Sequence, residues 1–171
     1  MYQTIKIDTL ELSPYALFGD QWLVLAAGDF RKNHFNAMTI AWGSLGCMWN
    51  KPFIQVVVRP GRYTHEFMES YDTFTVSAFP ANLKPALNVM GTKSGRNCDK
   101  IKESGLTPMA SQMVFAPSFK EADLIFECKK LYRDVLKPEG FFESGIDKNY
   151  PAKDYHTVYF GEIVTVLKKQ E

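Results

Sequence analysis

The run from Pro52 to Pro60, PFIQVVVRP, constrains the fold more than any other segment of the chain. Its centre is rich in β-branched residues, and a proline stands at each end, where a strand tolerates it. The run therefore predicts a strand over residues 52–60. Five further runs of strand length predict strands at 21–27, 37–42, 73–79, 124–132 and 156–168.

The order of these runs argues against a Rossmann-type sheet, because strands do not alternate regularly with helices. Three short helices are expected near the middle of the chain. The first is capped by Thr64, the second covers residues 83–90 and stops at Gly91, and the third lies between a cap at Asn97 and Gly105. About six strands in a mainly antiparallel order predict a small closed or partly closed barrel, which leaves few free strand edges.

The predicted strand at 124–132 is expected to have one face in water. Its alternation sets Leu124, Phe126 and Cys128 against Ile125, Glu127 and Lys129. A strand with one apolar and one partly charged face usually lies at the boundary between core and solvent.

The composition is that of a globular protein, and a single domain over residues 1–171 is expected. Apolar residues make up 46% of the chain and the formal charge is +1, so neither disorder nor a general electrostatic affinity for nucleic acid is predicted. The three cysteines form no CxxC pair, which argues against a disulfide framework and a zinc site and favours reduced thiols in a cytoplasm. No run has the length of a membrane span, and no signal-peptide pattern begins the chain.

Several common enzyme signatures are absent. The segment GTKSGR has the residue types of a phosphate loop but not the order GxxxxGK[ST]. WGSLG lacks the GxSxG spacing of a nucleophile elbow, so Ser44 is a poor candidate nucleophile. His34, His65 and His156 show no metal-ligand spacing, and no metal site is expected.

Three segments together carry the chemistry of a candidate site. Residues 36–46, NAMTIAWGSLG, run along a predicted strand into a glycine turn. Residues 59–64, RPGRYT, and residues 93–100, KSGRNCDK, are basic and stand just ahead of predicted helix starts. Arginine forks and helix N–H groups can hold a small dianion such as a phosphate monoester. The alternative is that both are solvated loops with ordinary surface charge.

These segments resemble the flavin reductase-like family of FMN-binding split barrels, and within it the flavoredoxin branch. The runs that carry the resemblance are NAMTIAWGSLGCMWNKPFIQVVVRPGRYTHEFMESYDTFTVSAF, GTKSGRNCDK and DYHTVYFGEI, and the similarity extends from about Trp22 to Val166. The resemblance implies a mainly β fold, a six-stranded antiparallel split β-barrel with Greek-key features and a few short helices. It also implies an obligate homodimer that holds FMN near the dimer interface.

The resemblance further implies which residues hold the cofactor. Those that match the family segment along the isoalloxazine ring are Asn36, Met38, Thr39, Trp42, Gly43 and Ser44. Those that match the part near the ribityl phosphate are Arg59, Arg62, Tyr63 and Thr64. Those that match the part closing over the phosphate are Ser94, Gly95, Arg96 and Lys100. His156 and Phe160 match the last-strand motif near the open face of the flavin.

Two of these residues have alternative roles. Lys100 either binds the phosphate or lies at the N1–C2=O edge of the flavin, where a positive charge would raise the reduction potential. His156 is either a hydrogen-bonding residue at the rim or a proton relay, and it is the one candidate catalytic residue.

Other side chains have simpler expected settings. Trp42 and Trp49 are expected in the core or an interface rather than stacked on a ligand. Cys47 is expected to be a small apolar filler. Cys98 stands just inside a predicted helix start, a setting that lowers the pKa of a thiol.

The function expected first is that of a cytoplasmic FMN-dependent oxidoreductase, in which NAD(P)H or a protein donor reduces bound flavin and the flavin passes electrons onward. No GxGxxG fingerprint is present, so a nicotinamide would dock directly over the flavin. The alternatives are a non-catalytic FMN electron carrier between partner proteins, and a split barrel with another ligand such as haem or pyridoxal phosphate. The choice of NADH or NADPH, the final acceptor, and whether FMN is prosthetic or exchanging are left open.

Overall fold

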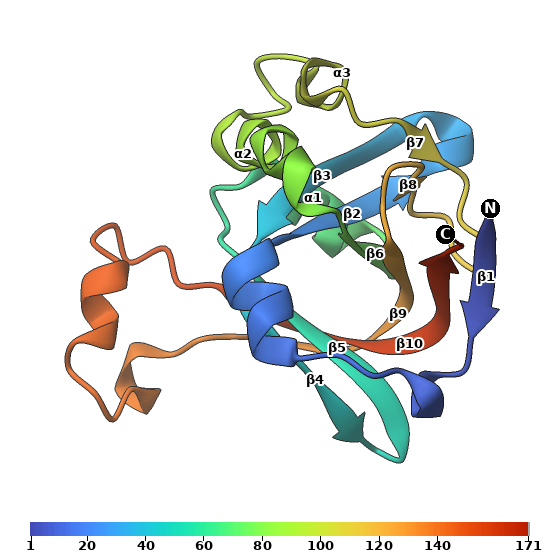
Figure 1. The fold of residues 1–171 in the computed structure, drawn as a ribbon. Helices are drawn as coiled ribbons and strands as arrows, with labels where there is room; N and C mark the ends of the chain where they lie inside the picture. The colour runs from blue at the N-terminus through green and yellow to red at the C-terminus, as the bar shows by residue number, and fades with distance from the viewer. Residues whose placement is uncertain (171) are drawn as a thin grey trace.

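The computed structural model describes residues 1–170, and its main feature is one curled sheet (Figure 1). The strands follow the order β3-β2-β6-β9-β10-β5-β4, β1 pairs with the far end of β10, and all pairings are antiparallel. The strands of this sheet are β1 (Tyr2–Ile5), β2 (Leu23–Asp29), β3 (His34–Ile40), β4 (Gly43–Met48), β5 (Lys51–Val58), β6 (Thr73–Ala78), β9 (Leu124–Val135) and β10 (Thr157–Lys169). β7 (Pro108–Met109) and β8 (Ser118–Phe119) form a separate ladder.

The sheet curls into a split barrel because its first and last strands are consecutive in the chain. β3 and β4 stand at opposite ends of the strand order, yet only Ala41 and Trp42 separate them in sequence. The short link draws the two free edges together without pairing them. The mainly β, antiparallel split-barrel fold is therefore confirmed.

All six predicted strands are present, but the strand count is higher than six. The additional strands are β1, β4, β7 and β8. The sequence does not predict β4, because its glycines indicate a turn rather than a strand. A Cβ at Gly43 would lie 2.5 Å from the ring of Phe18, and one at Gly46 would lie 3.1 Å from the ring of Phe53. These glycines therefore allow the rings of Phe18 and Phe53 to pack closely against the strand.

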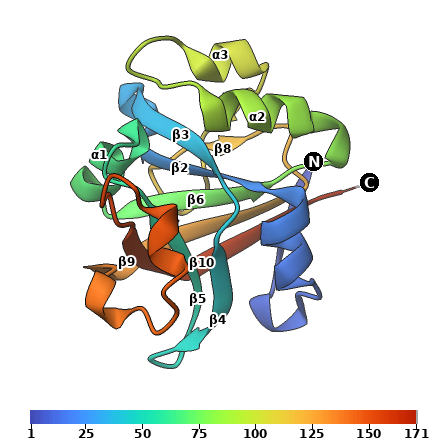
Figure 2. The same ribbon diagram turned by 90° about the vertical axis from the view of Figure 1, so that its left-hand side faces the viewer.

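Three short helices lie on one side of the barrel, α1 (Tyr63–Ser70), α2 (Lys84–Thr92) and α3 (Lys100–Ser104) (Figure 2). The shorter turns are a π-helix at Ala16–Gln21 and 3-10 helices at Ile7–Thr9, Phe30–Lys32, Ala81–Leu83, Pro138–Gly140 and Ile146–Asn149. The predicted helices exist, with different ends.

The two predicted helix caps are wrong. α1 begins two residues earlier, with Arg62 at its N-cap, and the Thr64 hydroxyl instead accepts a 2.8 Å hydrogen bond from the amide of Asn36. α3 is capped by Asp99, whose carboxylate accepts from the Lys102 N–H, rather than by Asn97. α2 also continues through Gly91 to Thr92.

Two apolar cores lie on the two faces of the sheet, and β2 contributes to both. Leu23, Leu25 and Ala27 point into the barrel, while Val24 and Ala26 face the outer core beneath α2. This alternation follows from the two-residue period of a strand. It explains why a continuous apolar run forms β2, since both of its faces are buried.

The expectation that β9 lies half in water is wrong for its first half. Ile125 and Glu127 are fully buried, like Phe126 between them. Residues 105–122 cover this face, and the Glu127 carboxylate accepts hydrogen bonds from the backbone N–H groups of Gln112 and Met113, at 2.8 and 2.6 Å. The buried charge is satisfied by backbone donors that are distant in sequence from the core of the strand.

Other expected settings have mixed outcomes. Trp42 and Trp49 are 51% and 55% exposed, so neither belongs to the core of this chain, and the expected interface setting stays a prediction. Cys47 is exposed instead of filling a gap, and all three cysteines are free thiols. Cys98 precedes α3 rather than standing inside it, and burial followed by the charge of Glu103 raises the pKa of its thiol.

Residues 136–156 project from the barrel between β9 and β10, to the left in Figure 1. The backbone N–H of Leu136 donates to the carbonyl of His156 and closes the base of this projection. The rings of Phe141, Tyr150 and Tyr155 pack together within it, with centroids 4.9 to 6.0 Å apart. The projection therefore has a small aromatic core of its own.

Candidate functional site

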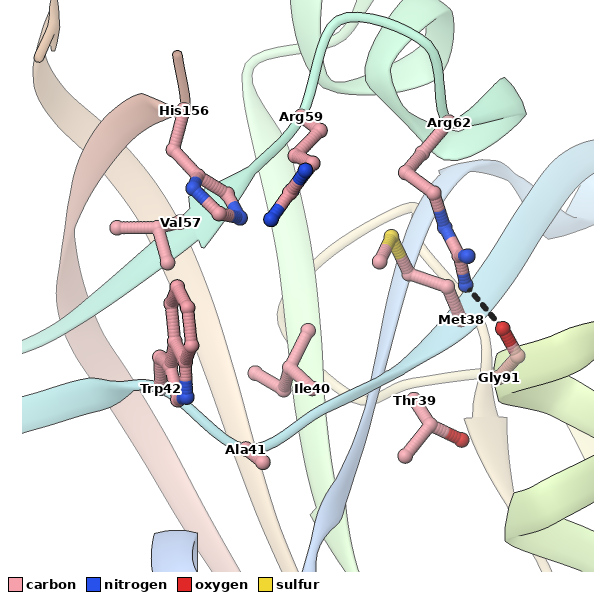
Figure 3. Close-up of a pocket in the computed structure, with 10 residues that line it drawn as sticks. All are labelled: Met38, Thr39, Ile40, Ala41, Trp42, Val57, Arg59, Arg62, Gly91 and His156. Atoms are coloured by element: carbon pink, nitrogen blue, oxygen red, sulfur yellow. Dashed lines mark hydrogen bonds between the residues drawn. The ribbon is translucent and has the colours of Figure 1, made fainter. Parts of the chain in front are cut away.

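A cavity of about 310 Å³ opens beside the link between β3 and β4. We call it the main cavity; its lining residues are Met38, Thr39, Ile40, Ala41, Trp42, Val57, Arg59, Arg62, Gly91 and His156 (Figure 3). The split between the sheet edges places it here, because Ile40 at the end of β3 pairs only with β2, and β5 continues to Val58 beyond its last pairing with β4 at Val56. Figure 3 shows Trp42 at one end and Arg62 with Gly91 at the other.

The Trp42 end of the main cavity is aromatic. The rings of Trp42 and His156 lie with centroids 5.3 Å apart. The hydroxyl of Tyr150 lies 2.8 Å from His156 Nδ1. Burial first, and then the nearby positive charge of Arg59, lower the pKa of His156 to about 4. The imidazole is therefore neutral at physiological pH.

Arg59 ties the projecting segment to the rim of the main cavity. Its guanidinium donates to the backbone carbonyl of Asn149 at 2.8 Å and to the carboxylate of Asp154 at 3.3 Å. It also lies over the ring of Tyr150, 5.1 Å from the centroid. Arg59 thus stands at the His156 side of the site.

Arg62 links the main cavity to a second, smaller one. Its Nη2 donates to the Gly91 carbonyl at 2.5 Å, and burial first and then Arg59 lower the pKa of the guanidinium. The small cavity has a volume of about 130 Å³. It is lined by Gly61, Arg62, Tyr63, Thr64, Thr92, Lys93, Ser94 and Lys100.

The small cavity is suited to an anion. The Lys100 side chain is almost fully buried, and its ammonium donates only to the backbone carbonyls of Met90 and Lys93, at 3.0 and 3.2 Å. No carboxylate pairs with it among residues 1–170, and burial followed by the charge of Arg62 lowers its pKa to about 8. Tyr63 and Thr64 begin α1, and the first N–H groups of a helix lack acceptors within the helix.

The turn at residues 94–96 forms one wall of this region. A Cβ at Gly95 would lie 2.4 Å from Asn36 Oδ1, so only a glycine fits against that buried amide. The Arg96 guanidinium donates to the Gly61 carbonyl at 3.2 Å and to the Glu66 carboxylate, and it lies over the ring of Tyr63. Arg96 therefore holds this turn against the start of α1.

The structure brings most of the sequence-predicted residues to these two cavities. Met38, Thr39, Trp42, Arg59, Arg62 and His156 line the main cavity, and Arg62, Tyr63, Thr64, Ser94 and Lys100 line the small one. Asn36, Gly95 and Arg96 lie behind the small cavity, along a surface groove that Tyr63 and Lys100 also line.

Three of the predicted residues lie elsewhere. Gly43 packs against Phe18 in β4, and the Ser44 hydroxyl donates to the side chain of Gln55 at 2.8 Å. Phe160 packs against Trp49, Phe53 and Tyr132, near the tip of the β4–β5 hairpin.

Sequence reasoning missed four residues that line the main cavity. Ile40 and Ala41 stand inside the quoted strand segment, Val57 is part of the apolar run before Arg59, and Gly91 was interpreted only as the end of a helix. Alternation along a strand relates Ile40 to Met38 and Val57 to Arg59, but it could not indicate Ala41, which lies in the link after β3. Gly91 could not be found in this way, because its place depends on how α2 packs over β3.

Two absences hold for residues 1–170, the part of the chain that the structure describes. No group of three or more His, Cys, Asp or Glu side chains in it is arranged to hold a metal ion. None of the helices in residues 1–170 is both long and apolar enough to cross a membrane.

The curled antiparallel sheet with a cavity at its split defines a split-barrel protein with a ligand site. A sequence model described as flavin reductase like domain matches residues 17–171, and the chain belongs to this family. The resemblance seen in the sequence is therefore confirmed.

The chain is also similar to individual curated proteins. A protein of Pyrococcus abyssi described as uncharacterized is 29% identical over 123 residues, which is 70% of this chain and 59% of that protein. This chain spans 59% and 64% of the length of two curated relatives that it matches.

Two solved structures share the fold. An FMN-binding domain of a flavin reductase-like enzyme from Shewanella baltica has a TM-score of 0.71 and 15% identity, over 98% of this chain and 77% of that one. Flavoredoxin of Desulfovibrio vulgaris has a TM-score of 0.69 and 23% identity, over 97% and 78% of the two chains.

Proposed function

We propose that this protein is an FMN-binding oxidoreductase, in which NAD(P)H or a protein donor reduces bound FMN and the FMN passes electrons to an acceptor. The observation that carries the proposal is the buried, unpaired ammonium of Lys100 beside Arg62 at the start of α1. A buried cation without a counter-ion is costly, and a bound phosphate would relieve that cost.

The residues of the site fit FMN by residue type. A flavin mononucleotide needs a flat apolar slot for its ring and an anion seat for its phosphate, with a path between them. Met38, Ile40 and Val57 provide apolar lining in the main cavity, and Arg62 lines both cavities. The ring would lie in the main cavity and the phosphate in the small one.

The phosphate would be held by Arg62, Ser94, Lys100 and the first backbone N–H groups of α1. Charge-assisted hydrogen bonds of this kind are the strong ones, and an arginine fork matches a phosphate in geometry. Lys100 lines the small cavity and not the main one, which favours the phosphate over the flavin edge as its partner. Arg59, in contrast, stands at the ring end beside His156.

When bound, FMN supplies reversible electron and hydride transfer at its ring. The chain itself contributes a dry apolar wall, a neutral His156 and the exposed face of Trp42 at the open end of the main cavity. A nicotinamide or another flat donor would enter at this end, since the chain shows no separate dinucleotide fingerprint.

An aromatic surface near the tip of the β4–β5 hairpin also fits a homodimer. The rings of Trp49, Tyr132 and Phe160 contact one another with centroids 6.1 to 6.3 Å apart, and Trp49 and Tyr132 are about half exposed. We call these three residues the aromatic patch. Exposed aromatic clusters are typical of protein interfaces. We propose that this patch pairs with a second copy of the chain.

Absorption and binding measurements test the cofactor. The full chain is expected to purify yellow or to become yellow with added FMN, and to bind FMN far more tightly than riboflavin, because only FMN has the phosphate. Equal affinity for the two would contradict the phosphate site. A visible spectrum of haem or pyridoxal phosphate would instead support another ligand in the same barrel.

Steady-state oxidation of NADH and NADPH separates the enzyme from its alternative. The proposed oxidoreductase consumes one of these nucleotides in the presence of FMN and an artificial acceptor. A non-catalytic electron carrier would show almost no turnover while still accepting electrons from a reduced partner. Loss of turnover with intact FMN binding would therefore favour the carrier.

A further inference from the structure

Tyr150 and His156 form a buried polar pair at the edge of the main cavity. The hydroxyl of Tyr150 and Nδ1 of His156 are 2.8 Å apart, and Tyr150 is only 2% exposed. Their rings meet edge to face with centroids 5.5 Å apart. Both residues belong to the projecting segment, and His156 is its last residue before β10, so the bond fixes Tyr150 against the base of the segment.

The donor in this hydrogen bond can be identified from what the buried phenol needs. A buried O–H needs an acceptor, and His156 Nδ1 is the only one within hydrogen-bond distance of Tyr150 among residues 1–170. The phenol therefore donates and Nδ1 accepts. A neutral imidazole that accepts at Nδ1 carries its proton on Nε2.

The surroundings keep both partners neutral. Arg59 lies over the Tyr150 ring and faces His156, and Asp154 is the carboxylate paired with Arg59. Burial lowers the pKa of His156 and raises the pKa of Tyr150. Both groups are therefore neutral near pH 7.

We propose that Tyr150 is a positioning residue that holds His156 as a neutral Nε2–H donor facing the main cavity. Figure 3 shows one ring nitrogen of His156 directed toward Arg59, on the cavity side of the ring. Such a donor suits a carbonyl or ring-nitrogen acceptor on a flat heteroaromatic ligand. This last step rests on the proposed function; the tautomer and its cause do not.

Nitrogen NMR of the full chain tests the pair without any ligand. The protein has only three histidines, so His156→Gln identifies the signals of His156. In the wild type, Nδ1 is expected to be an acceptor nitrogen and Nε2 to carry the proton. A proton on Nδ1 in the wild type would overturn the proposal, whether or not FMN binds.

The variant Tyr150→Phe keeps the ring and removes the donor. We expect a mixture of tautomers and a His156 titration midpoint about one pH unit higher, because a hydrogen bond to Nδ1 favours the neutral ring. The matched control is Tyr155→Phe, which removes a neighbouring phenol that donates to Asp147 instead. Both signals of His156 are expected to stay unchanged in the control.

An unchanged tautomer and midpoint in Tyr150→Phe would overturn the positioning role. With FMN bound, the proposal further expects the pH profile of FMN reduction by NADH or NADPH to change in Tyr150→Phe and not in Tyr155→Phe. If FMN fails to bind either protein, the NMR result still decides the role of Tyr150, and the proposed function alone is lost.

Discussion

Lys100 is a lysine in an unusual place, since its ammonium is buried against backbone carbonyls and has no carboxylate partner in the described chain. Its pKa is lowered to about 8, so the charged form prevails below pH 8 and the neutral form above it. A bound phosphate favours the charged form, and the phosphate itself is a dianion above about pH 6. FMN affinity is therefore expected to be highest between about pH 6 and 8.

The expected fall above pH 8 approaches tenfold per pH unit, because one proton must then be taken up on binding. Fluorescence titration with FMN from pH 6.5 to about pH 9.5 measures it. Riboflavin titrated over the same range is the control, since it shares the ring and lacks the phosphate. An FMN affinity that stays level through pH 9 would place Lys100 outside the phosphate site.

Arg62 lines both cavities, and its replacement should affect binding of the FMN phosphate much more than binding of the flavin ring. Loss of one charged hydrogen bond costs roughly 1.5–3 kcal/mol. Arg62→Ala is therefore expected to weaken FMN binding by about ten- to a hundredfold and to leave riboflavin binding nearly unchanged. Arg62→Lys should fall between, because it keeps the charge and loses the fork.

Arg96→Ala is the matched control for Arg62, because the Arg96 guanidinium is engaged by Glu66 and the Gly61 carbonyl and does not line the small cavity. Arg96→Ala should reduce FMN affinity less than Arg62→Ala does. A larger reduction in Arg96→Ala would indicate that the phosphate binds at the turn of residues 94–96 instead.

At the scale of elements, the turn at residues 94–96 closes on the start of α1 only because position 95 has no side chain. In Gly95→Ala, the new Cβ would meet Asn36 Oδ1 and push the turn off its support. We expect a loss of about 1–3 kcal/mol in the free energy of unfolding, together with weaker FMN binding. Thermal and urea unfolding, with an FMN titration, measure both effects.

Gly61→Ala supplies the comparison in the neighbouring turn. A Cβ there would meet nothing within 4 Å, so its stability should be unchanged or slightly higher. Equal stability of the two alanine variants would contradict the packing argument at Gly95.

At the scale of the whole molecule, the aromatic patch predicts a two-fold homodimer. Trp49→Ser should release monomers, because aromatic residues at the centre of an interface often contribute 2 kcal/mol or more. Light scattering on the wild type and the variant measures the mass in solution. Met113→Ser changes another exposed apolar residue outside the patch and should leave the dimer intact. A monomeric wild type with FMN fully bound would refute this prediction.

Much of the fold was accessible from the sequence because strand signals are local. The β-branched run that became β5, and the alternation in β6, depend on neighbouring residues and on burial of one or both faces. The residue types of the site were also local, in the basic turns at 59–64 and 93–100. These segments predicted an anion site before any geometry was known.

The tertiary structure decided the features that depend on contacts distant in sequence. α1 begins before Thr64, whose hydroxyl accepts from Asn36 in β3, and the outer face of the first half of β9 is buried because residues 105–122 cover it. The main cavity exists because the short link between β3 and β4 joins two sheet edges that do not pair. Hydrogen-bond partners and burial are set by the residues that pack nearby in space, and these contacts cannot be inferred from neighbouring residues along the chain.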